Sequence, residues 1–163
     1  MATAIRAPTT TRTALDHYTW LVGRLLDVPA VCISLIDVDG WLTTSSYGLA
    51  PPNAMLVAWS FLRQTPDTGR PVVIDDARAD PRAAQSRAVS DGMVAAYLGM
   101  RLVASDGCVV GTLSAMAGSP RQWTSRDLGF LEKVRDRILA MRAGTPTALG
   151  THGRTDVAIV GAR

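Results

Sequence analysis

The stretch that decides the fold is DGMVAAYLGMRLVASDGCVVGTLSAM, residues 91–116. Two apolar runs, YLGMRLVA and CVVGTLSAM, lie on either side of the turn Ser105-Asp106-Gly107. Asp and Gly tolerate the positive φ of a tight hairpin, so this pattern predicts two antiparallel strands. The runs contain a single charged residue, Arg101. We therefore expect both strands to lie near the centre of a sheet rather than at its edge.

Amphipathic helices are predicted near both ends of the chain. Residues 13–28 open with Thr13 and Asp16 in capping-box-like spacing, and Pro29 stops the helix. Their apolar face consists of Leu15, Tyr18, Val22, Leu25 and Leu26. The second helix is the longest, with Thr124 as its N-cap and Asp127 near its positive end. Its apolar residues recur at steps of three and four: Leu128, Leu131, Val134, Ile138 and Met141.

Between these helices the pattern predicts further strands. VCISLID, from Val31, leads into the acidic turn Asp37, Asp39 and Gly40, and WLTTSSYGL forms the second strand of that hairpin. PVVI, residues 71–74, predicts a short buried strand. Short helical segments are expected within residues 51–64 and within 83–94. Strands in the middle with helices at both ends predict an α+β fold with an antiparallel sheet.

Composition is that of one globular domain. The chain has 163 residues, 47% hydrophobic and 19% charged, and no apolar run approaches the roughly 18 residues that span a bilayer. We expect a domain over residues 13–142, a flexible segment over 1–12 and a disordered tail over 143–163. The N-terminus lacks the apolar stretch of a secretory signal, so a cytoplasmic location without membrane attachment is expected.

Charge and cysteine content exclude several classes of function. The net charge is +3, but the basic residues are scattered and Lys133 is the only lysine, so no nucleic-acid partner is expected. Cys32 and Cys108 form no CxxC pair, which argues against zinc and against a disulfide framework. His17 and His152 fall in the first helix and the tail, where we expect them to face solvent rather than to ligate a haem or a metal.

Four segments of the chain resemble, in order and spacing, the GAF family of sensory domains. They are LLDVPAVCISLIDVDGWLTTSSYGL, WSFLRQTPDTGRPVVIDDARADPR, AYLGMRLVASDGCVVGTLSAM and PRQWTSRDLGFLEKV. The resemblance implies a central antiparallel sheet of five to six strands, with the terminal helices on one face and a pocket on the other, as in GAF and PAS domains. It also implies binding of a small molecule or dimerisation, and a report to a separate kinase, phosphatase or cyclase.

The chain departs from the family at several positions. Its look is closest to bacterial signalling members with a Ser-Phe-Cys segment, but the thiol position is Leu62 here. Covalent bilin attachment is therefore not expected, and no cofactor is identified. The cyclic-nucleotide signature is absent because the chain has a single lysine. The segment that often reads Gly-x-Pro-Leu contains Arg101, and the acidic residue that often ends the last strand is replaced around Ala117.

Residue alternation and the resemblance together give a set of ligand-binding candidates. Period-two alternation puts Cys32, Ser34 and Ile36 on one face of the first strand, and Thr112, Ser114 and Met116 on one face of the last. Arg101 is either a pocket group for an anion or a side chain that reaches solvent at the strand edge. Asp76, with Asp75, either forms a carboxylate pair or caps a turn. The candidates are Ser34, Phe61, Leu62, Asp76, Met93, Tyr97, Arg101 and Ser114.

Three functions remain open at this point. The first is a stand-alone sensory domain, not an enzyme, that binds an unidentified small molecule or a protein and signals through a parallel homodimer of its terminal helices. The second is a thiol-dependent reductase similar to the free methionine sulfoxide enzymes, although Cys32 and Cys108 match none of the cysteine cluster of that branch. The third is a ligand-free dimerisation scaffold whose pocket is filled by its own side chains, Leu62 and Met93 among them.

Overall fold

The computed structural model of the protein describes residues 9–36, 42–49, 61 and 70–144. Its elements are α1 (Thr9–Leu25), β1 (Ala30–Ile36), β2 (Leu42–Tyr47), β3 (Val72–Ile74), α3 (Arg87–Ser90), β4 (Ala96–Val103), β5 (Val109–Ala117) and α4 (Ser125–Ala143). The turn predicted at residues 37–40 and the two terminal segments, 1–8 and 145–163, lie outside the described residues. Of the helical segment predicted within 51–64, only Phe61 is described, and it is helical.

The five described strands form one antiparallel sheet in the order β2-β1-β5-β4-β3. The hairpin predicted from residues 91–116 is confirmed: β4 pairs with β5 throughout, and Gly107 has a positive φ of 82° in the turn between them. Asp106 also stabilises this turn, because its carboxylate accepts a hydrogen bond from the backbone N–H of Cys108. Both strands are central, as expected, and β5 lies in the middle of the sheet.

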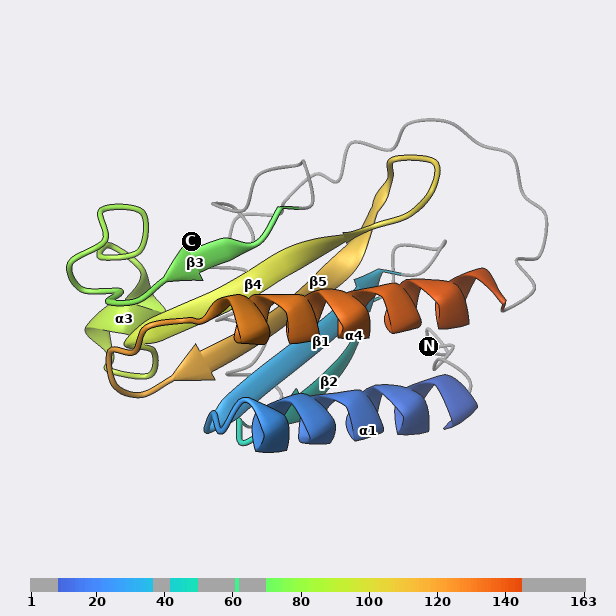
Figure 1. Ribbon diagram of the computed structural model, residues 1–163, viewed down its shortest axis with the longest axis horizontal. Coiled ribbons are helices and arrows are strands. Elements are labelled where there is room, and N and C mark those ends of the chain that lie inside the picture. Colours follow the sequence, from blue (N-terminus) through green and yellow to red (C-terminus); the bar gives the residue numbers. More distant parts are fainter. Residues whose placement is uncertain (1–8, 37–41, 50–60, 62–69, 145–163) are drawn as a thin grey trace, which may run out of the picture.

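Helices α1 and α4 lie side by side on the same face of the sheet, which we call the helical face (Figure 1). The apolar periodicity of α4 points Leu131, Val134 and Ile138 into the core between the helices and the sheet. The strands supply alternate residues to this core: Val31, Ile33 and Leu35 from β1, Leu98, Met100 and Leu102 from β4, and Leu113 and Ala115 from β5. The predicted shared side for the two end helices is confirmed.

A second, separate core lies on the opposite face of the sheet, which we call the distal face. Intervening strand residues point there, including Cys32, Tyr97 and Met116. The loop and helix between β3 and β4 cover part of this face with small and β-branched side chains: Ala77, Ala83, Ala88, Val89 and Val94. The sheet is therefore buried on both sides, which explains why β4 and β5 read as nearly continuous apolar runs.

The first helix differs from its prediction in where it begins. It starts at Thr9 instead of Thr13, so the predicted capping box is wrong. The carboxylate of Asp16 instead accepts a hydrogen bond from the Ser45 hydroxyl, at 2.5 Å, and joins α1 to β2. Leu25 was expected on the buried face but is 62% exposed. The pairing with β2 was invisible in the sequence, because Asp16 at helix position i+3 from Thr13 fits both roles.

The predicted start of α4 is confirmed in detail. The Thr124 hydroxyl accepts from the N–H of Asp127, and the Asp127 carboxylate accepts from the N–H of Thr124. This capping box satisfies two backbone donors that the first turn leaves without helical partners. None of the helices described here is long and apolar enough to cross a membrane.

We expect Gly111→Ala to be strongly destabilising. A Cβ at Gly111 would overlap the backbone oxygen of Ser34, and a backbone atom of a central strand cannot move aside as a side-chain end can. Overpacking of this kind costs about 1–3 kcal/mol or more of unfolding free energy, measured by urea denaturation. The matched control is Gly118→Ala, because a Cβ there meets nothing within 4 Å. Equal stability of the two variants would contradict the close approach of β1 and β5.

Candidate functional site

A row of polar side chains crosses the distal face of the sheet. Register pairs Thr44 of β2 with Ser34 of β1, Ser34 with Thr112 of β5, and Thr112 with Arg101 of β4. We call these four residues the polar row. All point away from α1 and α4, because their chain neighbours Ile33, Leu113 and Met100 belong to the core of the helical face. Four strands thus place three hydroxyls and one guanidinium in a line.

Two members of the polar row satisfy each other. The hydroxyls of Ser34 and Thr44 lie 3.4 Å apart, and the Cys32 thiol lies 3.6 Å from the Ser34 hydroxyl. The sequence therefore identified the correct face for Ser34. This observation also fits the interpretation that such hydroxyls bond to their neighbours, since the Ser34 contacts are local.

Thr112 differs from its neighbours. Its side chain is 5% exposed, and its hydroxyl finds no hydrogen-bond partner in the described part of the chain. A buried hydroxyl without a partner costs about 1–3 kcal/mol, so native proteins rarely leave one in place without a use. Sequence reasoning placed Thr112 on this face but did not include it among the ligand-binding candidates; its central position beside Arg101 was the signal that would have found it.

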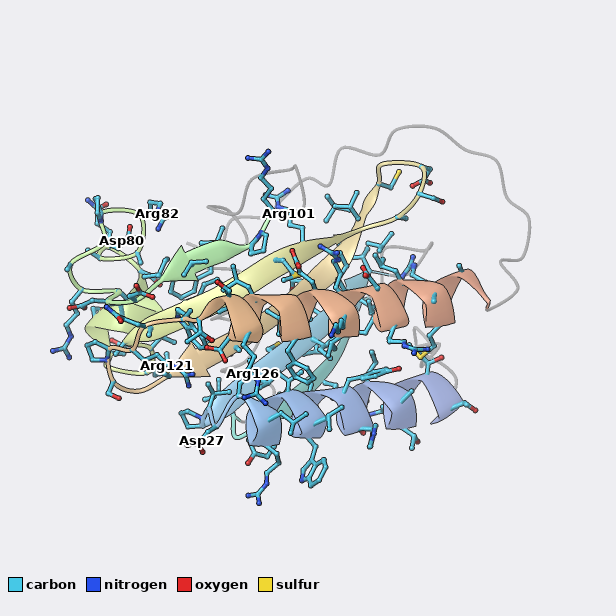
Figure 2. The ribbon with its side chains drawn as sticks, viewed as in Figure 1. Asp27, Asp80, Arg82, Arg101, Arg121 and Arg126 are labelled. Carbon is cyan, nitrogen blue, oxygen red and sulfur yellow. The ribbon has the colours of Figure 1, made fainter. Side chains whose placement is uncertain are left out.

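Arg101 is half-buried on β4 and extends the polar row beyond the end of β3, which pairs with β4 only over Val72–Ile74. Figure 2 shows Arg101 well apart from the other labelled arginines, Arg82, Arg121 and Arg126. The described strand positions of the distal face contain no carboxylate to offset its charge. The described part of this face therefore carries a positive charge next to a buried, unsatisfied hydroxyl.

At the other end of the same face an aromatic stack fills the space. The rings of Phe61 and Tyr97 are nearly parallel, with centroids 4.1 Å apart, and both side chains are buried. The Tyr97 hydroxyl lies 2.9 Å from that of Ser114 on the next strand. Gly99 makes this arrangement possible, because a Cβ there would overlap the Tyr97 ring and hydroxyl. The structure therefore brings together three of the sequence candidates, but in contacts with one another.

The remaining candidates lie elsewhere. Asp76 is in the loop after β3, where its carboxylate accepts from the backbone N–H of Arg78, and Asp75 accepts from the N–H of Trp123. Both aspartates are thus used in loop contacts of the kind the turn-cap interpretation describes. Met93 packs at the border of the distal core, and Leu62 lies outside the described residues.

The two thiols are far apart and poorly suited to nucleophilic chemistry. Burial raises the pKa of Cys32, and the charge and hydrogen bonding of Asp106 raise the pKa of the exposed Cys108. Cys32 pairs with Ser114, six residues along β5 from Cys108, which is roughly 20 Å at the rise of a strand. A disulfide needs Cα atoms within about 7 Å, so these cysteines cannot resolve one another in the folded protein.

A group of contacts that sequence reasoning missed joins the sheet edge to both terminal helices. The Arg121 guanidinium donates to the carbonyl oxygens of Leu26, at 2.9 Å, and Asp27, at 3.4 Å, just beyond α1. It also pairs with Asp127 in the first turn of α4 at 3.5 Å and lies 4.4 Å from the centroid of the Trp123 ring. We call Arg121 and Trp123 the junction; Figure 2 shows Arg121, Asp27 and Arg126 gathered at this end of the helices.

The junction also reaches the distal face. The Trp123 indole donates to the carbonyl oxygen of Ile74 in β3 at 3.1 Å, and the backbone N–H of Arg121 donates to the Asp75 carbonyl. The Ile74 side chain belongs to the distal core with Phe61 and Tyr97. A displacement of β3 is therefore transmitted by direct hydrogen bonds to the end of α1 and the beginning of α4. In the part of the chain that the structure describes, no cluster of three or more metal-ligating side chains occurs.

Tyr97→Phe is expected to lower the unfolding free energy by about 1–3 kcal/mol, because it leaves the fully buried Ser114 hydroxyl without its partner. Denaturant unfolding of Tyr97→Phe, Ser114→Ala and the double variant measures the interaction. The double variant should lose less stability than the two single variants together. Strict additivity would mean that the two hydroxyls do not interact.

The comparisons with known proteins agree with this architecture. The model of the GAF domain family matches residues 10–139. A GAF domain from Synechocystis, solved in its photoproduct state, is similar with a TM-score of 0.63 at 12% identity, covering 81% of this chain and 92% of that one. A domain from Sinorhizobium meliloti, of a protein described as a two-component sensor histidine kinase, gives a TM-score of 0.66 at 14% identity, covering 84% and 94%.

A third solved structure is the GAF domain of a phosphoenolpyruvate-protein phosphotransferase from Acinetobacter. It has a TM-score of 0.60 at 16% identity and covers 84% of each chain. No curated protein matches this chain by sequence. At these identities the solved structures support the fold alone, whereas the family model spans most of the chain and both terminal helices. The chain therefore belongs to the GAF domain family.

Proposed function

We propose that the protein is a sensory domain that binds a small molecule on the distal face and reports binding through α1 and α4. The observation that carries this proposal is the polar row, where the hydroxyl of Thr112 is buried without a partner. A ligand that accepts or donates a hydrogen bond there would remove that penalty, so its binding would stabilise the fold. The similar solved structures include photoreceptor and sensor-kinase domains, which supports a sensory role.

The junction supports the reporting half of this proposal. Binding on the distal face would bias the position of β3, and Trp123 and Arg121 connect β3 to both terminal helices by hydrogen bonds. The effector would be a separate protein of the kinase, phosphatase or cyclase class. We propose a cytoplasmic protein that does not bind nucleic acid or membranes.

Native mass spectrometry of protein purified from its natural host tests the binding half. We expect a noncovalent adduct that is lost when the same sample is denatured. An unmodified mass under both conditions would contradict the proposal. It would support the ligand-free scaffold, which the Phe61–Tyr97 stack on the distal face favours, because these side chains already fill part of that surface.

We further propose that the module works as a parallel homodimer through its terminal helices. Among the described residues, the large apolar side chains that remain exposed are Trp20, at 51%, and Leu25, at 62%, and both lie on α1. A second copy of the chain would bury them, together with the outer side of the neighbouring α4.

Light scattering of the purified protein at tens of micromolar is expected to give the mass of a dimer. Trp20→Glu should give a monomer, because it places a charge in the contact while α1 keeps its buried face. Glu132→Gln is the matched control, since it changes a charge on α4 without removing apolar surface. A monomeric wild-type protein would contradict the dimer.

We propose that the protein is not a thiol-dependent reductase, because both pKa values are raised and the thiols lie far apart. A thiol reagent at neutral pH should label Cys108 and leave Cys32 unmodified until the protein unfolds. A raised pKa means less thiolate at a given pH, so Asp106→Asn, which removes the nearby charge, should speed the labelling of Cys108. Cys108→Ser identifies the signal. Rapid labelling of Cys32 in the folded protein would reopen the reductase alternative.

A further inference from the structure

We infer that the ligand of the distal face is a small oxyanion, a carboxylate or a phosphate, held by Arg101 and Thr112. This inference rests on the proposed binding function and names its chemical class. The two residues face each other across β4 and β5, with Ser34 as the next residue of the row on β1. Directly opposite positions of adjacent strands place their Cβ atoms about 4.5–5.5 Å apart, so one small group can contact both side chains.

The chemistry of the two side chains favours an oxyanion over a neutral group. A guanidinium presents N–H donors in a planar fork that matches a carboxylate or a phosphate, and a threonine hydroxyl adds one further donor. The Thr112 hydroxyl is buried and without a partner in the part of the chain described, so it is available to donate. A ligand oxygen between these groups would satisfy it and would lie next to the charge of Arg101.

The charges around the site point the same way. Along the described strand positions of the distal face Arg101 is the one arginine or lysine, and Asp and Glu are absent from them. The carboxylates of Asp75, Asp76 and Asp80 belong to the loop after β3, where they accept hydrogen bonds from Trp123, Arg78 and Arg82. A half-buried positive charge of this kind attracts an anion more strongly than it would in water, because nearby protein lowers the effective dielectric constant.

The geometry also limits the size of the ligand. The Phe61–Tyr97 stack occupies the end of the face near β3, and Tyr97 is fixed there by its hydrogen bond to Ser114. The space over the polar row therefore belongs to short side chains, those of Ser34, Thr44 and Thr112. A compact anion with a small planar or aliphatic body fits this position better than an extended cofactor.

Thermal unfolding and ligand-observed NMR with matched probes test the inference. The probes are sodium benzoate, sodium acetate and inorganic phosphate, with benzamide and acetamide as neutral counterparts, all at constant ionic strength. We expect at least one anion to raise the unfolding temperature saturably and the amides to have no effect. Arg101→Met, which keeps much of the side-chain volume, should weaken anion binding at least tenfold, and Thr112→Val should weaken it several-fold.

Arg87→Met is the matched control, because Arg87 is an exposed arginine on α3, away from the polar row; its anion affinity should equal that of the wild type. Equal binding of the anions and the amides, or unchanged anion affinity in Arg101→Met, would overturn the inference. If no probe binds but native mass spectrometry finds a neutral adduct, the oxyanion class is wrong and the sensory function stands. If neither a probe nor an adduct binds, both proposals fail.

Discussion

The structure depends on β5, the strand that belongs to both cores at once. It pairs with β1 on one side and β4 on the other, and Gly111 allows β1 to approach so closely that a Cβ would overlap its backbone. Because alternate residues point to opposite faces, Leu113 and Ala115 complete the core under the helices, while Thr112, Ser114 and Met116 form the distal face. A shift of β5 by one residue would exchange these two sets and destroy both layers.

The two faces differ in chemistry, and this difference separates stability from function. The helical face is aliphatic and tightly covered, and its burial is the main source of folding free energy. The distal face contains hydroxyls, a thiol, a guanidinium and a glycine where a purely structural layer would have larger apolar groups. The Tyr97–Ser114 hydrogen bond and the Phe61 ring satisfy one end of this face, and the polar row remains at the other. The junction then connects the distal face to the helices without passing through the aliphatic core.

Most of the fold could be predicted from the sequence, because it is written in local patterns. The β4–β5 hairpin follows from Ser105-Asp106-Gly107 between two apolar runs, and α4 follows from Thr124, Asp127 and a regular apolar stripe. The start of α1 could not be predicted, since the carboxylate of Asp16 bonds to Ser45, a residue 29 positions away. The exposure of Leu25 also depends on which side of α1 meets the sheet, and residues four apart share a helix side only approximately.

The candidate site was predictable in part. Alternation placed Ser34 and Ser114 on the distal face, and the resemblance to the family added Phe61 and Tyr97. Neither source could say that Tyr97 would bond to Ser114, because that contact depends on the register of β4 against β5 and on the absence of a Cβ at Gly99. Thr112 and the junction were missed for the same reason. Their roles arise from partners far along the chain, such as the Leu26 carbonyl, 95 residues from Arg121.

Residue-resolved hydrogen exchange measured by NMR tests the central role of β5 most directly. In this account the amides of Leu113, Ser114 and Ala115 open only when the whole domain unfolds, because β5 is paired on both sides and covered on both faces. Their exchange should therefore be the slowest in the protein and should report the global unfolding free energy. Exchange of these amides as fast as that of the edge strand β3 would contradict the account.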